Sequence, residues 1–322
     1  MIIHARAFEY EALIRAEVRD DLPDLEIVAA RDKNDLPSSI EDAEAILAWR
    51  IPKDIIRRAT GLKWLASTGA GVDHLLLPEL PLDVQITKAP PIFAEAISEY
   101  VMGYTLYVSL GMEKILFNAR NRVWSVPEHF RLSGKLMGIL GMGTIGTHVA
   151  RAAKLFGMNV WGVRRTAERA GATPAQGTQA ASGGADRILG RDELESFLPH
   201  LDFLVLTLPL TEETRGMIGK DEISLLKPTC WIINVSRGRI VDEDDLARVL
   251  GEGKLGGYVS DVFASEPLPE DSPLWRLPNV IITPHYAALT QPEEFVPHFA
   301  DNLKRFARGE ALLFRIDREK GY

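Results

Sequence analysis

The segment KLMGILGMGTIGTHVARAAKLFG, residues 135–157, decides the fold. It opens with a short apolar run typical of a buried parallel strand, and it ends with apolar residues at helical spacing. Between the two, Gly141, Gly143 and Gly146 follow the G-x-G-x-x-G spacing. In this context the glycines permit a tight turn, a close approach of the backbone to a pyrophosphate, and close packing of the helix. A turn that binds nothing is the alternative, but the strand and the helix on either side favour a dinucleotide site.

The helix that follows the glycines would present unpaired backbone N–H groups and a partial positive charge to the phosphates. We therefore expect the cofactor to contact this turn and the first residues of the helix. The expected contacts are Gly141, Met142, Gly143, Thr144 and Ile145.

Two arginines end the next predicted strand, Met158–Val163. NAD-binding proteins carry an acidic residue about 20 residues after the first glycine, where it holds the ribose 2′-hydroxyl. Here Arg164, Arg165 and Thr166 occupy that place. Guanidinium groups offer forked donors and a permanent charge, which suit a 2′-phosphate. The sequence therefore favours NADP(H) over NAD(H), and a pair of solvated surface arginines is the other explanation.

The composition is that of an ordinary globular protein. The 322 residues suggest two domains, and 46% are hydrophobic and 25% charged. A net charge of −8 and the lack of a long basic run argue against nucleic acid as a partner. The one cysteine, Cys230, heads an apolar run, so we expect a buried hydrophobic residue in a reducing compartment. Charged N-terminal residues and the absence of an apolar run of about 20 residues predict a cytoplasmic protein without a membrane segment.

Strand and helix patterns alternate along the chain, which predicts parallel sheets covered by helices. A long helical pattern from Phe93 to about Arg120 follows the first five apolar runs. Residues 173–186 are rich in small and polar residues, which predicts a surface loop. A terminal helix, Glu293 to Gly309, is expected to pack on the first domain. The early runs are Met1–Ile3, Ile27–Ala29, Ala45–Trp49, Trp64–Ser67 and Val84–Thr87.

Three chemically active residues, Arg237, Glu266 and His285, fall at or just beyond predicted strand ends of the second half. The carboxyl ends of parallel strands share one edge of the sheet, so these residues can converge near a bound nicotinamide. A histidine can give a proton to a carbonyl oxygen, and a carboxylate beside it favours the imidazolium. An arginine can bind a carboxylate at two points. Each residue alone has a plain structural explanation, but the set favours catalysis.

Two strand ends in the first half are also candidates. Trp49 and Arg50 follow one strand, and the turn TGAGVDH at 68–74 follows the next. Gly69 and Gly71 would let backbone N–H groups face an anion, although a plain connection to a helix is equally consistent with their position. Arg50 fits a surface cation better than a ligand, although its place at a strand end keeps it among the candidates.

Over essentially its whole length the chain resembles the D-isomer-specific 2-hydroxyacid dehydrogenase family. Trp49-Arg50 and the tail DNLKRFARGEALLFRIDREKGY are most similar to its glyoxylate/hydroxypyruvate reductase branch. The matching segments are GAGVDHL (69–75), GMGTIG (141–146), LPLTEETRGMI (208–218), INVSRGRIVDEDDL (233–246), DVFASEPLP (261–269) and TPHYAA (283–288).

The resemblance implies an α/β fold of two Rossmann-like or flavodoxin-like domains, with doubly wound parallel sheets and the active site in the cleft between them. A substrate domain would comprise residues 1–100 and 289–322, and a dinucleotide-binding domain residues 101–288. The implied activity is NADPH-dependent reduction of small 2-oxo acids of the glyoxylate/hydroxypyruvate type to D-2-hydroxy acids. Family members are usually homodimers, and in the reductase branch a tryptophan near Trp124 can reach the partner's active site.

By the same resemblance His285 is the proton donor, Glu266 is its partner and Arg237 binds the substrate. No metal is expected. Asp261 would orient the nicotinamide carboxamide. The implied substrate contacts are Arg50, Ala70, Gly71, Arg237 and His285. The further implied cofactor contacts are Leu208, Pro209, Thr214, Val235, Ser236, Arg237, Asp261 and His285.

The chain departs from the common family pattern at two places. Thr144 stands where an arginine often contacts the pyrophosphate, and Arg164-Arg165 replaces the usual acidic end. A formate dehydrogenase would carry glutamine in place of Glu266. The alternatives that stay open are another specificity, such as phenylpyruvate or phosphoglycerate, and a non-catalytic NAD(P)-sensing protein resembling the C-terminal-binding corepressors.

Overall fold

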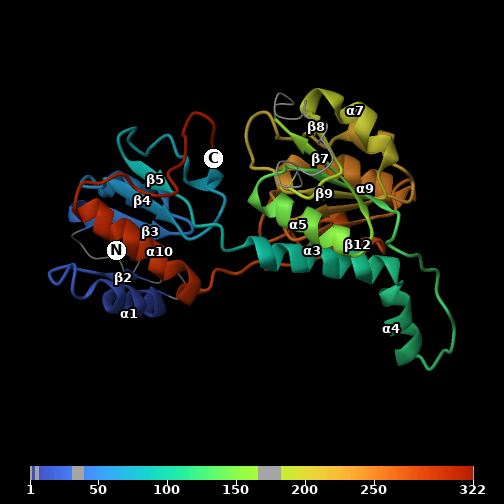
Figure 1. Ribbon diagram of the computed structural model, residues 1–322, viewed down its shortest axis with the longest axis horizontal. Coiled ribbons are helices and arrows are strands. Elements are labelled where there is room, and N and C mark those ends of the chain that lie inside the picture. The colour runs from blue at the N-terminus through green and yellow to red at the C-terminus, as the bar shows by residue number, and fades with distance from the viewer. Residues whose placement is uncertain (1, 4–6, 31–39, 166–182, 322) are drawn as a thin grey trace. The chain divides into compact units, whose positions relative to one another are not determined.

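The computed structural model describes residues 2–3, 7–30, 40–165 and 183–321 (Figure 1). The chain divides into two compact units, Met1–Ile92 with Leu289–Tyr322, and Phe93–Ala288. Helix α3 (Ala94–Ser109) begins just after the first boundary and packs against α5 (Thr144–Leu155). Residues 93–100, which we expected in the first unit, therefore belong to the second.

The first unit is built on a five-stranded parallel sheet in the order β2-β1-β3-β4-β5. This is a doubly wound order in which the chain reverses direction across the sheet at β1 and β3. Its strands are β1 (Ile2–Ile3), β2 (Ala29–Ala30), β3 (Ala45–Ala48), β4 (Trp64–Ser67) and β5 (Gln85–Thr87). Its first two helices are α1 (Ala7–Val18) and α2 (Lys53–Arg58).

Helix α10 (Pro292–Ala307) completes the first unit. It packs against α1, and the ring of Phe295 meets Tyr10 edge to face with 5.8 Å between centroids. Its Phe299 stacks on the fully buried Trp64 of β4 at 5.1 Å. The expectation that the terminal helix returns to the first unit is confirmed.

The second unit is built on a seven-stranded parallel sheet in the order β12-β11-β10-β9-β6-β7-β8. The chain runs outward from β6 to β8 and then crosses back to β9 beside β6, as in dinucleotide-binding sheets. Its inner strands are apolar and buried on both faces, because helices cover the two sides. The strands are β6 (Leu136–Leu140), β7 (Asn159–Arg164), β8 (Arg187–Gly190), β9 (Phe203–Leu206), β10 (Trp231–Asn234), β11 (Gly257–Ser260) and β12 (Val280–Ile282).

Besides α3 and α5, the described part of the second unit contains the helices α4 (Met112–Arg120), α7 (Leu194–Phe197), α8 (Lys220–Leu225) and α9 (Glu243–Gly251). Short 3-10 turns occur in both units. Those among the described residues are Ile40–Asp42, Asp73–Leu75, Arg191–Glu193, Leu198–His200, Gly238–Ile240 and Pro273–Arg276. Strand β8 and helices α7 and α8 had no counterpart among our expectations.

The helix predicted from Phe93 to Arg120 is interrupted at Gly111. This residue has a φ of +61°, a left-handed conformation that glycine adopts at little cost. Helix α3 therefore ends at Ser109 and α4 begins at Met112. Figure 1 shows α4 and the segment after it projecting from the sheet of the second unit.

Cys230 is buried directly before β10, as expected, and burial raises the pKa of its thiol. Within the described ranges, no helix has the length and apolar character needed to cross a bilayer.

Candidate active site

The glycine turn after β6 has the geometry that its spacing predicts. Gly141 has a φ of +104°, and a Cβ there would lie 2.7 Å from the carbonyl oxygen of Thr207. A Cβ on Gly146 would collide with the Gly141 carbonyl, so the third glycine permits close packing of α5. A Cβ on Gly143 would meet nothing within 4 Å, so this residue borders open space. The turn therefore fits a pyrophosphate, which needs a backbone that it can approach closely.

The other residues that we expected to contact the cofactor at this turn differ in how far they are buried. Met142 is buried, and its side chain occupies the space that a Cβ on Gly162 would need. Its side chain therefore packs in the interior, and only its backbone faces the turn. Thr144 is exposed at the first turn of α5, and Ile145 is half-buried behind it.

The neighbouring strands β7 and β8 end at the same edge of the sheet, and each is followed by an arginine. Arg164 and Gly190 are register partners, so the next residues, Arg165 and Arg191, lie side by side just beyond the strands. Both guanidinium groups contact the Glu213 carboxylate, Arg165 at 2.7 Å and Arg191 at 3.4 Å. Within the described residues, Arg164 Nε is buried and has no hydrogen-bond acceptor. Thr166, also expected to contact the cofactor, lies outside the described residues, as do residues 173–182 of the predicted surface loop.

The loop after β9 is tied to the glycine turn. Thr207 Oγ1 donates to the Gly141 carbonyl at 2.7 Å. Further along, Thr214 Oγ1 donates to the Pro209 carbonyl at 2.7 Å and accepts from the N–H of Thr211 at 2.8 Å. The Thr214 hydroxyl thus holds the loop in shape, while Leu208 packs on the core and Pro209 is exposed.

Asn234, at the end of β10, shapes the loop that carries Arg237. Its side-chain nitrogen donates to the Arg237 carbonyl at 3.1 Å, and its oxygen accepts from both the N–H and the hydroxyl of Ser236. A Cβ on Gly238 would collide with the backbone of Phe263, so this glycine lets the loop approach the one after β11. The Arg237 loop is therefore held beside the segment that carries Glu266. Val235, also expected near the cofactor, is half-buried in the same loop.

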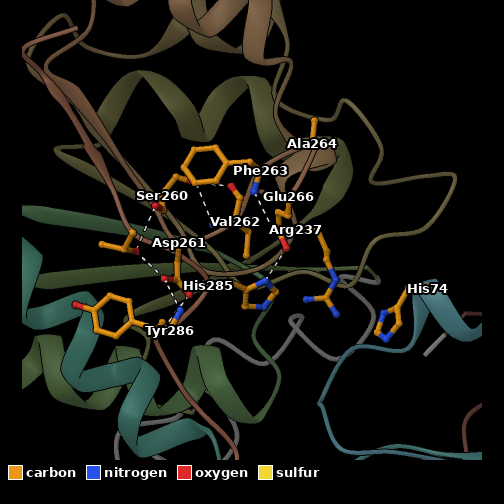
Figure 2. A network of polar contacts seen from close by, with 12 residues as sticks. His74, Arg237, Ser260, Asp261, Val262, Phe263, Ala264, Glu266, His285 and Tyr286 are labelled. Atoms are coloured by element: carbon orange, nitrogen blue, oxygen red, sulfur yellow. Dashed lines mark hydrogen bonds and ion pairs between the residues drawn. The ribbon is translucent and has the colours of Figure 1, made fainter. Parts of the chain in front are cut away.

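Glu266 and His285 form a hydrogen-bonded pair. His285 Nδ1 lies 2.9 Å from Glu266 Oε2, and Glu266 Oε1 accepts from the N–H of Phe263 at 3.1 Å (Figure 2). An ionised carboxylate only accepts hydrogen bonds, so Nδ1 carries the proton of this bond. Nε2 is then the ring nitrogen through which His285 would exchange a proton with a substrate.

The Asp261 carboxylate positions the turn that contains His285. It is 2% exposed and accepts three hydrogen bonds, from Thr283 Oγ1 at 2.6 Å and from the N–H groups of Tyr286 and Ala287 at 2.9 Å each (Figure 2). Between these anchors His285 adopts a φ of +54°, a left-handed conformation that is uncommon outside glycine. Asp261 thus stabilises a strained backbone at His285.

A buried tyrosine extends this network to α3. Because Thr283 donates to Asp261, the hydroxyl of Tyr100 is the donor in its 2.7 Å bond to Thr283 Oγ1. Burial raises the pKa of Tyr100, so it remains a neutral donor at neutral pH.

The candidates of the first unit cluster after β3 and β4. The Trp49 indole occupies the space of a Cβ on Gly69, and its ring lies 4.4 Å from that of His74. His74 Nε2 also bonds to the Trp49 carbonyl. Considering the described residues alone, the N–H groups of Ala70 and Gly71 make no hydrogen bond, as a backbone site for an anion requires. Arg50 is exposed.

Sequence reasoning missed several residues that support these sites. Asn234 and Thr283 directly precede loops that it had identified, and their places at strand ends were the available signal. Tyr100 and Arg191 carried no such signal, because their partners are distant in the sequence. Among the described residues, no group of histidine, cysteine and acidic side chains is placed to hold a metal ion.

A seven-stranded parallel sheet in which the inner strand β6 runs into a glycine turn defines a dinucleotide-binding α/β protein. Residues 102–287 match the family model described as D-isomer specific 2-hydroxyacid dehydrogenase, NAD binding domain. The chain is 31% identical over 291 residues to glyoxylate/hydroxypyruvate reductase A of Escherichia fergusonii, covering 88% of each chain.

Two solved structures are similar over nearly their full length. A D-isomer specific 2-hydroxyacid dehydrogenase family protein from Aeromonas salmonicida is 35% identical, with a TM-score of 0.87 and 98% of each chain covered. The NADPH-dependent glyoxylate/hydroxypyruvate reductase from Sinorhizobium meliloti, in complex with NADP and sulfate, is 29% identical. The TM-score is 0.83, and the match covers 97% of this chain and 96% of the Sinorhizobium meliloti chain. The protein belongs to the D-isomer specific 2-hydroxyacid dehydrogenase family, in which it resembles the glyoxylate/hydroxypyruvate reductase branch, and it is an NAD(P)-dependent oxidoreductase.

Proposed function

We propose that the protein reduces small 2-oxo acids, glyoxylate and hydroxypyruvate first, to D-2-hydroxy acids with NADPH. The observation that carries this proposal is the 2.9 Å bond between His285 and Glu266, in loops at the strand ends of the sheet that bears the glycine turn. The name of the Escherichia fergusonii relative and the NADP in the Sinorhizobium meliloti structure support the substrate class and the cofactor.

When bound, the cofactor would supply the hydride for reduction at C2 of the substrate. His285 donates a proton from Nε2 to the C2 oxygen, which would otherwise become an alkoxide. Glu266 fixes the ring through Nδ1 and favours the imidazolium that donates this proton. Arg237 pairs with the developing charge on oxygen and with the substrate carboxylate, for which its forked donors are suited.

Other residues take binding roles in this proposal. The N–H groups of Ala70 and Gly71 hold the substrate carboxylate, with Arg50 contributing charge. Arg164 and Arg165 take the 2′-phosphate, for which the buried Arg164 Nε supplies a donor that lacks an acceptor among the described residues. Asp261 also orients the nicotinamide carboxamide.

We also propose a cytoplasmic homodimer that forms through α4 and the segment after it, residues 112–131. This arm, as we call residues 112–131, exposes apolar side chains that a monomer would leave in water. Phe117 is 56% exposed and Trp124 102% exposed. A second copy of the chain would cover them, and Trp124 would then reach the active site of the partner. Further exposed apolar residues of the arm are Ile115, Leu116, Val123, Val126 and Phe130.

The test is NADPH oxidation by purified protein with glyoxylate, hydroxypyruvate, phenylpyruvate and phosphohydroxypyruvate. We expect the highest kcat/KM with glyoxylate or hydroxypyruvate, and a higher value with NADPH than with NADH. A higher kcat/KM with phenylpyruvate or phosphohydroxypyruvate than with glyoxylate and hydroxypyruvate would overturn the proposed substrate class. Tight NADPH binding without turnover on any acid would favour a cofactor-sensing protein instead.

A further inference from the structure

Glu213 contacts two of the three arginines at the ends of β7 and β8. Its Oε1 accepts from Arg165 Nη2 at 2.7 Å, and its Oε2 lies 3.4 Å from Arg191 Nη1. Its backbone oxygen accepts from Arg191 Nη2 at 2.8 Å. The hydrogen bond from Arg165 lowers the pKa of Glu213, so the carboxylate is ionised at neutral pH.

This arrangement matters because a 2′-phosphate would need the same donors. Arg164, Arg165 and Arg191 emerge at the same level from neighbouring strands, next to the glycine turn. The N–H groups of Gly141 and Met142 donate to the Val163 carbonyl, at 3.1 and 3.3 Å, directly before Arg164. The pyrophosphate turn and the arginines are therefore joined through the end of β7.

We propose that Glu213 is a specificity-determining residue that weakens the preference for NADP(H) by occupying the guanidinium groups of Arg165 and Arg191. This inference rests on the proposed assignment of these arginines to the 2′-phosphate. A phosphate that binds here must displace the carboxylate from Arg165 or share the arginine with it, and the two anions repel each other. A ribose that carries only a 2′-hydroxyl meets no such competition.

The effect should be modest, because all three side chains are partly exposed to solvent. Exposed ion pairs are worth little individually, so we expect their removal to change the affinity for a 2′-phosphate about threefold to tenfold. Removing the carboxylate of Glu213 leaves its backbone carbonyl in place, and with it the bond that holds Arg191 Nη2. The arginines should therefore stay near their present positions in Glu213→Gln.

Glu212 provides a matched control. It is the neighbouring glutamate, it carries the same charge, and its side chain lies 3.8 Å from Arg215 rather than near Arg165 or Arg191. Glu212→Gln therefore changes the net charge equally without touching the arginines that we assign to the phosphate.

The experiment measures the Kd of 2′,5′-ADP and of 5′-AMP by calorimetry for the wild type, Glu213→Gln and Glu212→Gln. We expect Glu213→Gln to raise the ratio of Kd for 5′-AMP to Kd for 2′,5′-ADP about threefold to tenfold, and Glu212→Gln to change it less than twofold. An unchanged or reduced ratio in Glu213→Gln would overturn the inference, because Glu213 would then orient the arginines for the phosphate. An equal rise in both variants would also overturn it, because the effect would then reflect net charge alone.

A wild type that binds both ligands equally would contradict the proposed NADPH preference. A rise in Glu213→Gln would still support the role of Glu213 in that case, so the two failures are distinguishable. Arg191→Gln gives a second measurement that does not depend on the folding of Glu213→Gln. It should weaken 2′,5′-ADP binding about tenfold and leave 5′-AMP binding unchanged. No change in either affinity would exclude Arg191 from the site and overturn the inference.

Discussion

Asp261 Oδ1 accepts a hydrogen bond of 2.9 Å from the N–H of Tyr286, the residue that follows His285. Because the same carboxylate also binds Ala287 and Thr283, the backbone on both sides of His285 depends on one buried side chain. The position of His285, the proposed proton donor, thus depends on Asp261. Asp261 follows β11, whereas His285 itself follows β12.

Asp261→Asn should destabilise the protein and lower its activity. An amide has one acceptor oxygen, so at least one of the three donors would be left buried without a partner. Such a group costs about 1–3 kcal/mol. We expect a lower thermal midpoint and a fall in kcat that exceeds any change in KM. The control is Asp271→Asn, at an exposed position, which should alter neither quantity. Wild-type stability in Asp261→Asn would show that these bonds do not support the turn.

His285→Ala should abolish most of the reductase activity while the protein remains folded. Loss of a general acid costs about 10²- to 10⁴-fold in rate. Glu266→Gln should cause a smaller loss, since the ring keeps a neighbour but loses the charge that favours the imidazolium. Steady-state kinetics of each variant, with circular dichroism as a check of folding, measures these effects. Near-normal turnover in His285→Ala would refute its assignment as proton donor.

Much of the second unit could be predicted from the sequence, because most of its strands are short, continuous apolar runs. The spacing of Gly141, Gly143 and Gly146 predicts a tight turn, close approach of a pyrophosphate and close packing of the helix. In the structure each of the three glycines has the surroundings that its predicted role needs. The apolar run that Cys230 heads also predicted its burial. These features depend on local chemistry, which the sequence records directly.

The errors arose where a distant partner or a single backbone angle decides the structure. The apolar pattern continues through Gly111, so only its φ of +61° reveals that α3 ends there. Arg191 resembles any exposed arginine until the register of β7 and β8 places it beside Arg165. Tyr100 was not among our candidates, because its bond to Thr283 joins segments that are far apart in the chain.

Phe117→Asp should convert a dimer into a monomer. The substitution places a charge in the middle of the apolar surface of the arm, where a partner chain would have to bury it. We expect light scattering to give the mass of one chain for the variant and of two chains for the wild type. Leu82→Asp is the matched control, since Leu82 is 88% exposed and lies in the first unit, outside the arm, and its variant should remain dimeric. A monomeric wild type would contradict the proposed assembly directly.

Glu243→Gln should stabilise the protein at alkaline pH. Burial raises the pKa of Glu243 above its ordinary value, with a smaller contribution from the neighbouring acids Asp244 and Glu266. The folded state therefore holds the proton more tightly than the unfolded state. The stability that this gives is complete below the ordinary pKa of a glutamate, and it is lost as the pH rises through the raised value.

The amide that Glu243→Gln introduces stays neutral, and its oxygen can still accept the bond from the N–H of Ala264, which is 2.7 Å long in the wild type. The variant and the wild type should thus unfold at similar urea concentrations near pH 4, and the variant should need more urea at pH 8. Glu293→Gln is the control, because it removes an exposed glutamate charge from the first turn of another helix, α10, and should bring no gain at pH 8. A less stable Glu243→Gln at pH 8 would mean that the charge stabilises α9 at its N-terminus by more than its burial costs.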